Sequence, residues 1–253
     1  MGEPYPFQSN FTEGPGAPRC TKDGSHAGAS GCEPKIRSSP GRKAPVVPGD
    51  AGKESDVRRV LKVASERLGA IDFLVNHAGG ARGADTDDPI DIADYKGGNR
   101  LLASNLGSTF LCARHVAPEM VKRKSGRIVN ISSISEITGD CGPAYCAAKA
   151  GVLGLTRHSA VALAPYVQLN AILPGFVDSA PHDPEKAGHI TPGRKMGHPE
   201  EIADLVGYLI ATPQTFFTGT SIVMDGSVTN GIVGRMMNWE YAAGPDERAK
   251  TAG

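Results

Sequence analysis

The sequence predicts an α/β fold with a doubly wound parallel sheet, and three observations carry this prediction. After residue 56, segments with apolar residues at helical spacing alternate four times with short apolar runs. These runs are unbroken, which is typical of strands in a parallel sheet that is covered on both faces by right-handed crossovers. The 253 residues suffice for one such domain. Ligands of such sheets bind at the carboxyl ends of the strands, so chemistry is expected after Asn76, Ser133 and Leu173.

The chain divides into three parts by composition. Residues 1–45 are rich in Gly, Pro and Ser with few aliphatic side chains, and we predict an irregular, poorly ordered segment. Residues 46–233 carry the alternating pattern and form the predicted domain, which begins with a strand stub at Val46-Val47 between two prolines. Residues 234–253 are predicted to be a polar tail.

Each element of the domain has its own signal. The first helix follows a Ser55-Asp56 cap and stops at Gly69, and the last has Pro199 in its first turn, where Glu200 and Glu201 favour the positive end of the helix dipole. The remaining segments are assigned by apolar spacing or by apolar runs. Together they predict helices over 57–68, 101–122, 144–163 and 199–210, and strands over 71–76, 127–133, 167–173 and 221–226.

Composition excludes several classes of function. The 27 basic and 27 acidic residues balance, so nothing favours nucleic acid or an anionic membrane as a partner. No apolar run reaches the roughly 18 residues of a membrane span, and we identify no signal-peptide core. The five cysteines form no C-x-x-C motif, which favours free thiols in a cytoplasmic protein.

Tyr145 and Lys149 form the first candidate site. They are spaced i, i+4 in a predicted helix and share one face. A tyrosine that exchanges protons at neutral pH needs its pKa lowered by about 3 from ~10, or about 4 kcal/mol. An ammonium ~4 Å away at an effective dielectric of ~20 supplies about that much. The pair is thus competent as a general acid/base, although the spacing alone favours a solvated tyrosine beside a surface lysine.

Two polar residues extend this candidate site. Ser133 ends the preceding strand, and the turn-rich loop after it can bring its hydroxyl near Tyr145, where it would stabilise charge on a substrate oxygen. Asn105 is a polar residue among apolar neighbours in a predicted helix. A buried amide bonded to the backbone is the alternative interpretation of Asn105.

These residues occur within an ordered set of motifs that resembles the short-chain dehydrogenase/reductase family over residues 46–226. The set consists of N76-H-A-G79, S104-N-L106, N130-I-S-S133, Y145-C-A-A-K149, Pro174-Gly-Phe-Val-Asp-Ser179, R194-K-M-G-H-P-E-E-I-A203 and T218-G-T-S-I-V-M-D-G226. One such motif alone would be weak, and the ordered set is strong. The resemblance implies a Rossmann-like fold and an oxidoreductase that interconverts a carbonyl and a secondary alcohol with NAD or NADP, as 3-oxoacyl reductases do.

The resemblance also implies a role for each matching residue. Tyr145 would be the general acid/base, Lys149 would lower its pKa and hold the nicotinamide ribose, Ser133 would polarise the carbonyl, and Asn105 would hold a relay water. The implied cofactor contacts are Asp50, Ala51, Asn76, Ala78, Gly79, Tyr145, Lys149, Pro174, Gly175 and Val177. Ser132 remains the alternative to Ser133, because it restores the commonest family spacing to Tyr145. Since strand side chains alternate between faces, only one of the two can serve.

The chain departs from the family at its start. We find no strand followed by T-G-x-x-x-G-x-G, the turn that seats the cofactor diphosphate, so the first β-α-β unit is predicted to be degenerate or missing. The nearest glycine cluster is Gly24–Gly31, and Arg37-Ser38 is a weak remnant of a second strand end. The strand at 71–76 would then have an unpaired edge. A non-catalytic binding or scaffold protein with impaired cofactor binding is therefore the alternative function.

Other features leave partners and specificity open. The resemblance implies a homo-oligomer, a tetramer or dimer, paired through the helices at 101–122 and 144–163. The substrate is a small carbonyl or alcohol whose identity the loops do not reveal. No metal site is expected, and His182, Asp183 and His189 are interpreted as part of a lid over the substrate.

Overall fold

The computed structural model describes residues 46–81, 90, 93–178, 191–193, 195–211 and 216–231. Several predictions fall on residues outside these ranges. They concern the irregular segment 1–45 with Gly24–Gly31 and Arg37-Ser38, the lid residues His182, Asp183 and His189, and the tail 234–253.

The described residues form a parallel sheet of four strands, which follow one another across the sheet in chain order. The strands are β1 (Phe73–Asn76), β2 (Gly126–Ile131), β3 (Val167–Pro174) and β4 (Ser221–Met224). In register, Val75 pairs with Val129, and Asn130 pairs with Ala171. The predicted strands are therefore present, and Ser132 and Ser133 follow β2 rather than belonging to it.

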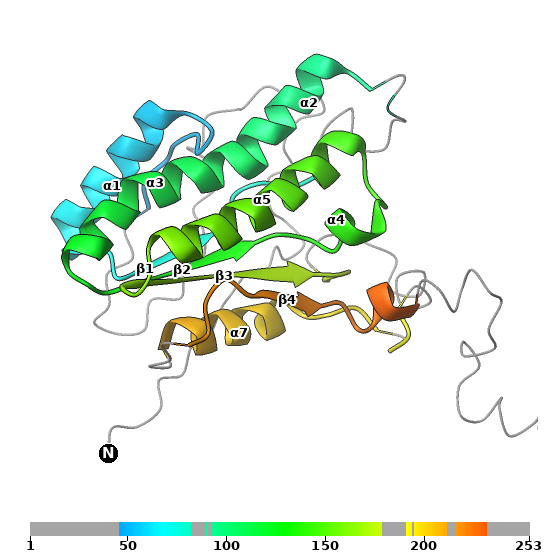
Figure 1. The fold of residues 1–253 in the computed structure, drawn as a ribbon. Helices are drawn as coiled ribbons and strands as arrows, with labels where there is room; N and C mark the ends of the chain where they lie inside the picture. The colour runs from blue at the N-terminus through cyan, green and yellow to red at the C-terminus, as the bar shows by residue number, and fades with distance from the viewer. Residues whose placement is uncertain are drawn as a thin grey trace, which may run out of the picture.

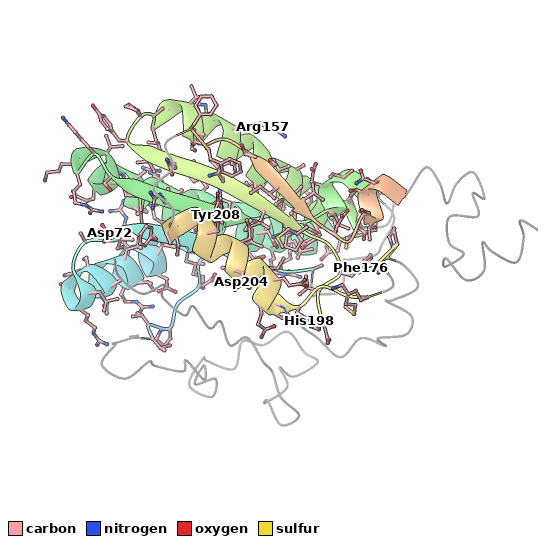
Figure 2. All side chains as sticks on the ribbon, turned by 90° about the horizontal axis from the view of Figure 1, so that it is seen from below. Asp72, Arg157, Phe176, His198, Asp204 and Tyr208 are labelled. Carbon is pink, nitrogen blue, oxygen red and sulfur yellow. The ribbon has the colours of Figure 1, made fainter. Side chains whose placement is uncertain are left out.

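Helices cover both faces of this sheet (Figure 1). One face carries α1 (Glu54–Leu68), α2 (Tyr95–Leu102), α3 (Ser108–Lys122) and α5 (Pro143–Ala162). The other face carries α7 (Pro199–Ala211), which Figure 2 shows lying across the strands with Asp204 and Tyr208. The doubly wound α/β architecture predicted from the sequence is thus confirmed.

The core is split between the two faces by the alternation of strand side chains. Ile128 and Leu169 pack with the apolar side of α3 and α5, whereas Val129 and Ile172 pack with α7. Each strand in the middle of the sheet therefore needs apolar residues at consecutive positions, which explains the unbroken runs in the sequence.

The third strand–helix–strand crossover, from β3 to β4, differs from the first two in its handedness. All three step across the sheet in the same direction, yet the helices of the first two, α3 and α5, lie on one face and that of the third, α7, lies on the other. Two crossovers that step across the sheet in the same direction have opposite handedness when their helices lie on opposite faces of the sheet. The expectation of uniformly right-handed crossovers is therefore wrong, and coverage of the second face depends on this exception.

The predicted strand stub at Val46-Val47 does not form, because residues 46–50 are irregular. Pro48 has no N–H to donate to a ladder, and no described strand lies beyond β1 to start one. The prediction that β1 has an unpaired edge agrees with its place at the end of the four-stranded sheet, where Phe73 and Val75 are exposed.

Two helical features went beyond the sequence prediction. The helix expected from residue 101 begins at Tyr95, where the Asp94 carboxylate accepts two backbone N–H groups, and it contains a π-helical turn, η1 (Ala103–Gly107). The loop after Ser133 contains a short helix, α4 (Ser135–Thr138), which ends at Gly139 with φ +63°. Both features lie next to the candidate site.

Candidate active site

Tyr145, Lys149 and Ser133 come together at the carboxyl ends of β2 and β3. Helix α5 begins at Pro143 after Gly142, which places Tyr145 in its first turn and Lys149 one turn later. The Lys149 Nζ lies 5.4 Å from the centroid of the Tyr145 ring. Ser133 lies near the Tyr145 side chain, where it counteracts part of the rise in the pKa of Tyr145. The three side chains therefore lie together as one group.

Lys149 is buried, and its Nζ donates a hydrogen bond to the Ile131 carbonyl at 3.1 Å. Burial lowers the pKa of Lys149 to about 8, because a charged ammonium loses its hydration there. The side chain is held at the end of β2 by one acceptor and by the Tyr145 ring.

The pKa of Tyr145 shifts opposite to the expectation from its spacing to Lys149. Burial of the phenol raises this pKa, and the nearby Ser133 side chain opposes the shift only in part. The nearby Cys141 and Asp140 raise it further. The reason is that loss of hydration disfavours the phenolate, so Tyr145 keeps its proton at neutral pH.

Ser132 and Ser133 have different partners, although both lie just beyond the end of β2. The Ser132 hydroxyl is buried and donates to the Lys149 backbone carbonyl at 2.9 Å, whereas Ser133 is half-buried and lies near Tyr145. The geometry thus favours Ser133 as the hydroxyl that faces a substrate, and Ser132 as a brace for helix α5.

Ser135 was missed in the sequence. Its backbone N–H donates to Ser133 Oγ at 3.2 Å, and its own Oγ lies 3.1 Å from Ser133 Oγ. Ser135 is buried at the start of α4. A serine hydroxyl often accepts the backbone N–H of the residue two positions later. Ser135 could therefore have been found from its spacing to Ser133.

Asn105 lies in the π-helical turn and binds the backbone of Gly80. Its Oδ1 accepts the Gly80 N–H at 2.9 Å, and its Nδ2 donates to the Gly80 carbonyl at 3.1 Å and to the Leu101 carbonyl at 3.0 Å. The amide is therefore buried and bonded to the backbone, which was the alternative interpretation. The relay water implied for Asn105 remains a prediction.

Gly79 and Gly80 form a turn that only glycine fits without strain. Their φ angles are +134° and +152°, and a Cβ on Gly79 would lie 2.4 Å from Asn105 Oδ1. No atom lies within 4 Å of the position of a Cβ on Gly80. Ala78 and Gly79 are exposed beside this open space. Loss of hydration and the charge of Lys149 lower the pKa of His77, so this turn faces the same site.

Asn76 is buried and binds other side chains of the protein. Its Nδ2 donates to Asn130 Oδ1 at 2.8 Å, and Asn130 Nδ2 donates to Thr156 Oγ1 at 3.0 Å. This chain ties β1 to β2 and to α5. It thereby fixes the position of the turn that follows β1.

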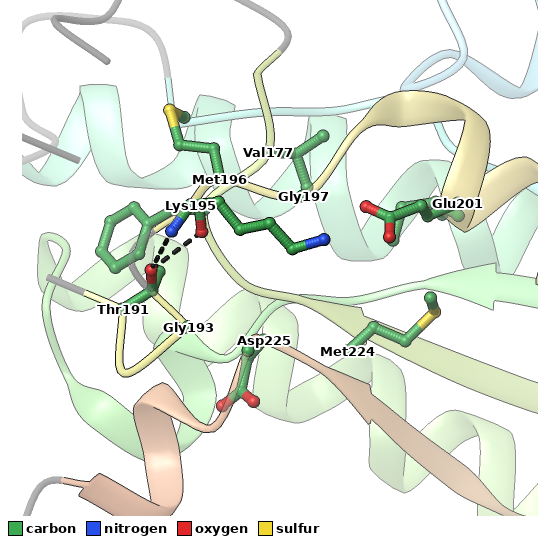
Figure 3. Close-up of a pocket in the computed structure, with 12 residues that line it drawn as sticks. Val177, Thr191, Gly193, Lys195, Met196, Gly197, Glu201, Met224 and Asp225 are labelled. Atoms are coloured by element: carbon green, nitrogen blue, oxygen red, sulfur yellow. Dashed lines mark hydrogen bonds between the residues drawn. The ribbon is translucent and has the colours of Figure 1, made fainter. Parts of the chain in front are cut away.

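Pro174, Gly175 and Val177 leave β3 beside a small cavity. A Cβ on Gly175 would lie 2.8 Å from Asp225, so only glycine lets these two segments approach. Val177 lines a cavity of roughly 180 Å³, together with Lys195 and the residues drawn in Figure 3. A hydrogen bond joins two positions of the segment beside this cavity, because Thr191 Oγ1 donates to the Lys195 carbonyl at 2.8 Å.

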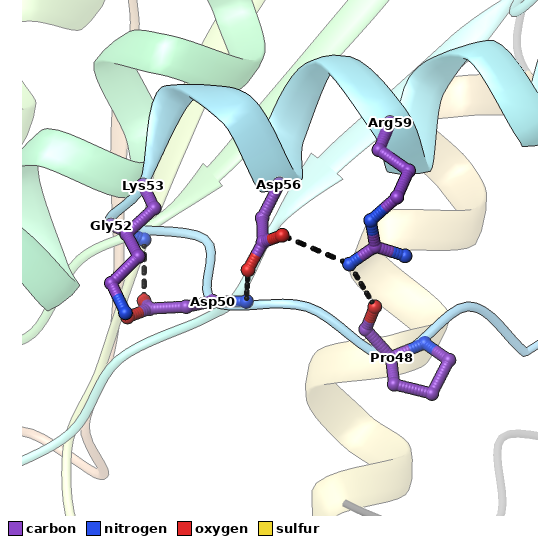
Figure 4. A network of polar contacts seen from close by, with 6 residues as sticks. All are labelled: Pro48, Asp50, Gly52, Lys53, Asp56 and Arg59. Carbon is purple, nitrogen blue, oxygen red and sulfur yellow. Dashed lines mark hydrogen bonds and ion pairs between the residues drawn. The ribbon is translucent and has the colours of Figure 1, made fainter.

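Asp50 and Ala51 lie at the start of α1 (Figure 4). Asp50 Oδ1 accepts the Gly52 N–H at 2.9 Å, and Oδ2 lies 3.5 Å from Lys53 Nζ. The Asp50 N–H is bound by Asp56, which also binds Arg59. The carboxylate is partly exposed and organises the turn, so an adenine contact would use its remaining acceptor capacity.

Lys149, the Gly79–Gly80 turn and the loop after β3 all lie at the carboxyl ends of the strands. Among residues 46–231 as described, no glycine-rich turn joins a strand to a helix N-terminus to seat a diphosphate. In the same ranges, no cluster of three His, Cys, Asp or Glu could hold a metal, and no helix is long and apolar enough to cross a membrane.

Comparison with known proteins gives consistent matches. A family model described as enoyl-(acyl carrier protein) reductase matches residues 23–229. The oxidoreductase UcpA of Escherichia coli K12 is 33% identical over 207 residues, covering 75% of this chain and 77% of UcpA. A 3-oxoacyl-[acyl-carrier-protein] reductase of Synechocystis is 34% identical over 194 residues, covering 74% and 77%. The solved structure of ElxO with NADP bound has a TM-score of 0.66 and 27% identity, covering 72% of this chain and 77% of ElxO.

Proposed function

This chain belongs to the short-chain dehydrogenase/reductase family of NAD(P)-dependent oxidoreductases, and we propose that it reduces a ketone to a secondary alcohol with Tyr145 as the general acid. The observation that carries this proposal is the group of Ser133, Tyr145 and Lys149 at the strand ends. The bound NAD(P)H would supply the hydride to the carbonyl carbon.

Three residues of the chain would donate the proton to the substrate oxygen and stabilise the negative charge that develops during the reaction. Tyr145 keeps its proton at neutral pH because burial raises its pKa, so it can donate the proton to the oxygen that becomes the alcohol. Ser133 lies near Tyr145 and can donate to the same oxygen as negative charge develops on it. Lys149, with a pKa of about 8, is mainly charged at pH 7 and stabilises the tyrosinate left after proton transfer.

The cofactor contacts are proposed from the same arrangement. Ala78 and Gly79 would line the adenosine side, Lys149 would bind the ribose, and Val177 would flank the nicotinamide. Asp50 and Ala51 would approach the adenine, and Pro174 and Gly175 would keep the loop close. NADP is supported by the likeness to ElxO, and NAD fits the described residues as well.

A 3-oxoacyl thioester is the proposed substrate class, supported by the relatives that are named 3-oxoacyl-[acyl-carrier-protein] reductase. Figure 3 draws Thr191, Lys195 and Gly197 beside the strand ends, where Phe176 and Val177 line the cavity with apolar surface. An acyl chain suits such a surface better than a sugar does.

The test is a reduction assay with purified full-length protein, acetoacetyl-coenzyme A, and NADPH or NADH. We expect oxidation of the cofactor, which Tyr145→Phe lowers by about 10²- to 10⁴-fold and Ser133→Ala by about 10²-fold. Ser132→Ala is the matched control, because its hydroxyl binds the Lys149 backbone, and a loss below about tenfold is expected. Equal losses in Ser132→Ala and Ser133→Ala would contradict the assignment of Ser133.

A binding or scaffold protein without turnover is the second candidate. It is favoured by the described residues, in which no glycine-rich diphosphate seat occurs and β1 ends the sheet. Titration of the protein with NADPH, followed by the fluorescence of the cofactor, separates the two candidates. Binding without turnover, or no binding at all, would support the scaffold.

We also propose a homo-oligomer that pairs through α3 and α5. Phe110 on α3 and Val161 on α5 are large apolar side chains that are exposed in the single chain. Such residues on helices that cover one face of the sheet suit burial against a second copy. Sedimentation velocity of the purified chain would reveal a dimer or tetramer, and a monomer would contradict the proposal.

A further inference from the structure

Two cysteines flank the first turn of the helix that carries Tyr145, with the Cys146 sulfur against the backbone of Cys141 and the Cys141 sulfur against Ser135. Gly142 caps α5, so Cys141 precedes the cap and Cys146 is the fourth residue of the helix. Side chains at these two positions of a helix start often contact each other across the first turn. The Cys146 thiol donates to the Cys141 carbonyl oxygen at 3.2 Å, and both side chains are reduced and half-buried. The two thiols thus occupy positions at which a pair of apolar side chains usually sets the direction of the chain as it enters a helix.

The same pair is connected to the candidate site by hydrogen bonds. Ser135 Oγ donates to Cys141 Sγ at 3.6 Å and lies 3.1 Å from Ser133 Oγ. Ser133 in turn lies near Tyr145, which lies between the two cysteines in sequence. A change in the Cys141 thiol therefore reaches Ser133 through a single side chain.

We propose that Cys141 and Cys146 are an oxidation site, at which a peroxide converts the two thiols to a disulfide and thereby slows turnover at Tyr145. In this step two S–H bonds break and one S–S bond forms. The two electrons cleave the O–O bond of hydrogen peroxide, and the two protons complete two water molecules. The effect on turnover rests on the proposed function, whereas the formation of the disulfide does not.

The expected loss of turnover follows from the contacts of Cys141. To reach Cys146, the Cys141 sulfur must turn away from Ser135, whose hydroxyl then loses its acceptor. The freed Ser135 hydroxyl can then bind Ser133 Oγ more strongly and draw it away from Tyr145. Small displacements of reacting groups cost large factors in rate, so we expect a loss of about tenfold or more.

The disulfide can be mapped by peptide mass after treatment of the full chain with hydrogen peroxide, alkylation and trypsin digestion. The peptide 128–149 contains Cys141 and Cys146 and no other cysteine, and the peptide 101–114 contains Cys112 alone. We expect the first peptide to lose the mass of two hydrogens and to resist alkylation. Cys112 on α3, whose thiol pKa is raised by burial, is the internal control and should remain alkylated. Full alkylation of Cys141 and Cys146 after such treatment would overturn the proposal.

Turnover is then measured on the same samples. The untreated protein should lose activity with peroxide and regain it with dithiothreitol, and Cys112→Ala should behave in the same way. Cys146→Ala should keep its activity in peroxide. Loss of activity in Cys146→Ala under the same treatment would overturn the link to the site. Should the chain show no turnover at all, the peptide masses still decide whether the thiol pair is oxidised.

Discussion

The centre and the edge of the sheet differ more than their sequences suggest. Val129 in β2 and Val75 in β1 pair in register, so their side chains lie next to each other on the same face. Val129 is 1% exposed and Val75 is 41% exposed, because α7 covers β2, β3 and β4 but not β1. Identical residues in similar apolar runs thus have different surroundings, and coverage by neighbouring elements decides between them.

The candidate active site follows this division. Ser133, Tyr145 and Lys149 are built on β2 and α5, which belong to the covered centre. The turn at Gly79–Gly80 follows the open edge strand and is held there by Asn76 and Asn105. The groups proposed for proton transfer therefore have firm support, whereas the proposed cofactor side depends on a few polar contacts.

The largest expected effect comes from truncating the two paired valines. Val129→Ala should lower the free energy of unfolding by about 2 kcal/mol, because it leaves a cavity among buried neighbours. Val75→Ala should lower it by less than about 1 kcal/mol, because solvent already reaches the side chain. Urea unfolding of both variants measures the difference. Equal losses would mean that the edge is covered by something else in solution.

Lys149→Met should raise the free energy of unfolding at pH 7 by about 1–2 kcal/mol while abolishing reductase activity. The folded-state pKa of about 8 lies below the ordinary 10.5, so the unfolded chain binds this proton more tightly. Folding with the charge buried therefore costs free energy below pH 8, partly offset by the bond to the Ile131 carbonyl.

The free-energy cost of burying charged Lys149 should decrease as pH rises. Between about pH 8 and 10.5 the unfolded chain carries more protons at Lys149 than the folded chain, so the contribution of Lys149 becomes less unfavourable as pH rises. The advantage of Lys149→Met should accordingly shrink between pH 7 and about pH 9.5 in urea unfolding. An advantage that grows with pH would contradict burial as the cause.

The smallest effect on stability is expected at the open edge. Phe73→Lys should change the free energy of unfolding by less than about 0.5 kcal/mol, because the ring is 47% exposed. It should nevertheless reduce aggregation in light scattering, because a lysine on an edge strand discourages pairing with other chains. Leu68→Lys, at 56% exposure on α1, is the control, and an equal reduction there would show that the edge is not special.

Much of the fold was predictable because it depends on local apolar spacing. The strands and most helices were found this way, and the order of motifs indicated which side chains would meet at the strand ends. The helical start at Tyr95 was missed because it rests on an Asp94 cap rather than on an apolar stripe. The strand stub at Val46 was wrong because a strand needs a neighbour as well as suitable residues.

By itself, the sequence determined the family, the parallel sheet and the pairing of Tyr145 with Lys149 on one helix face, since these follow from residue type and spacing. Only the tertiary structure decided that Ser133 faces Tyr145 while Ser132 braces α5, and that burial raises the pKa of Tyr145. It also decided that Val75 is open to solvent while its partner is covered. Hydration and hydrogen-bond partners depend on what packs nearby from distant parts of the chain, and one-dimensional spacing carries no measure of that.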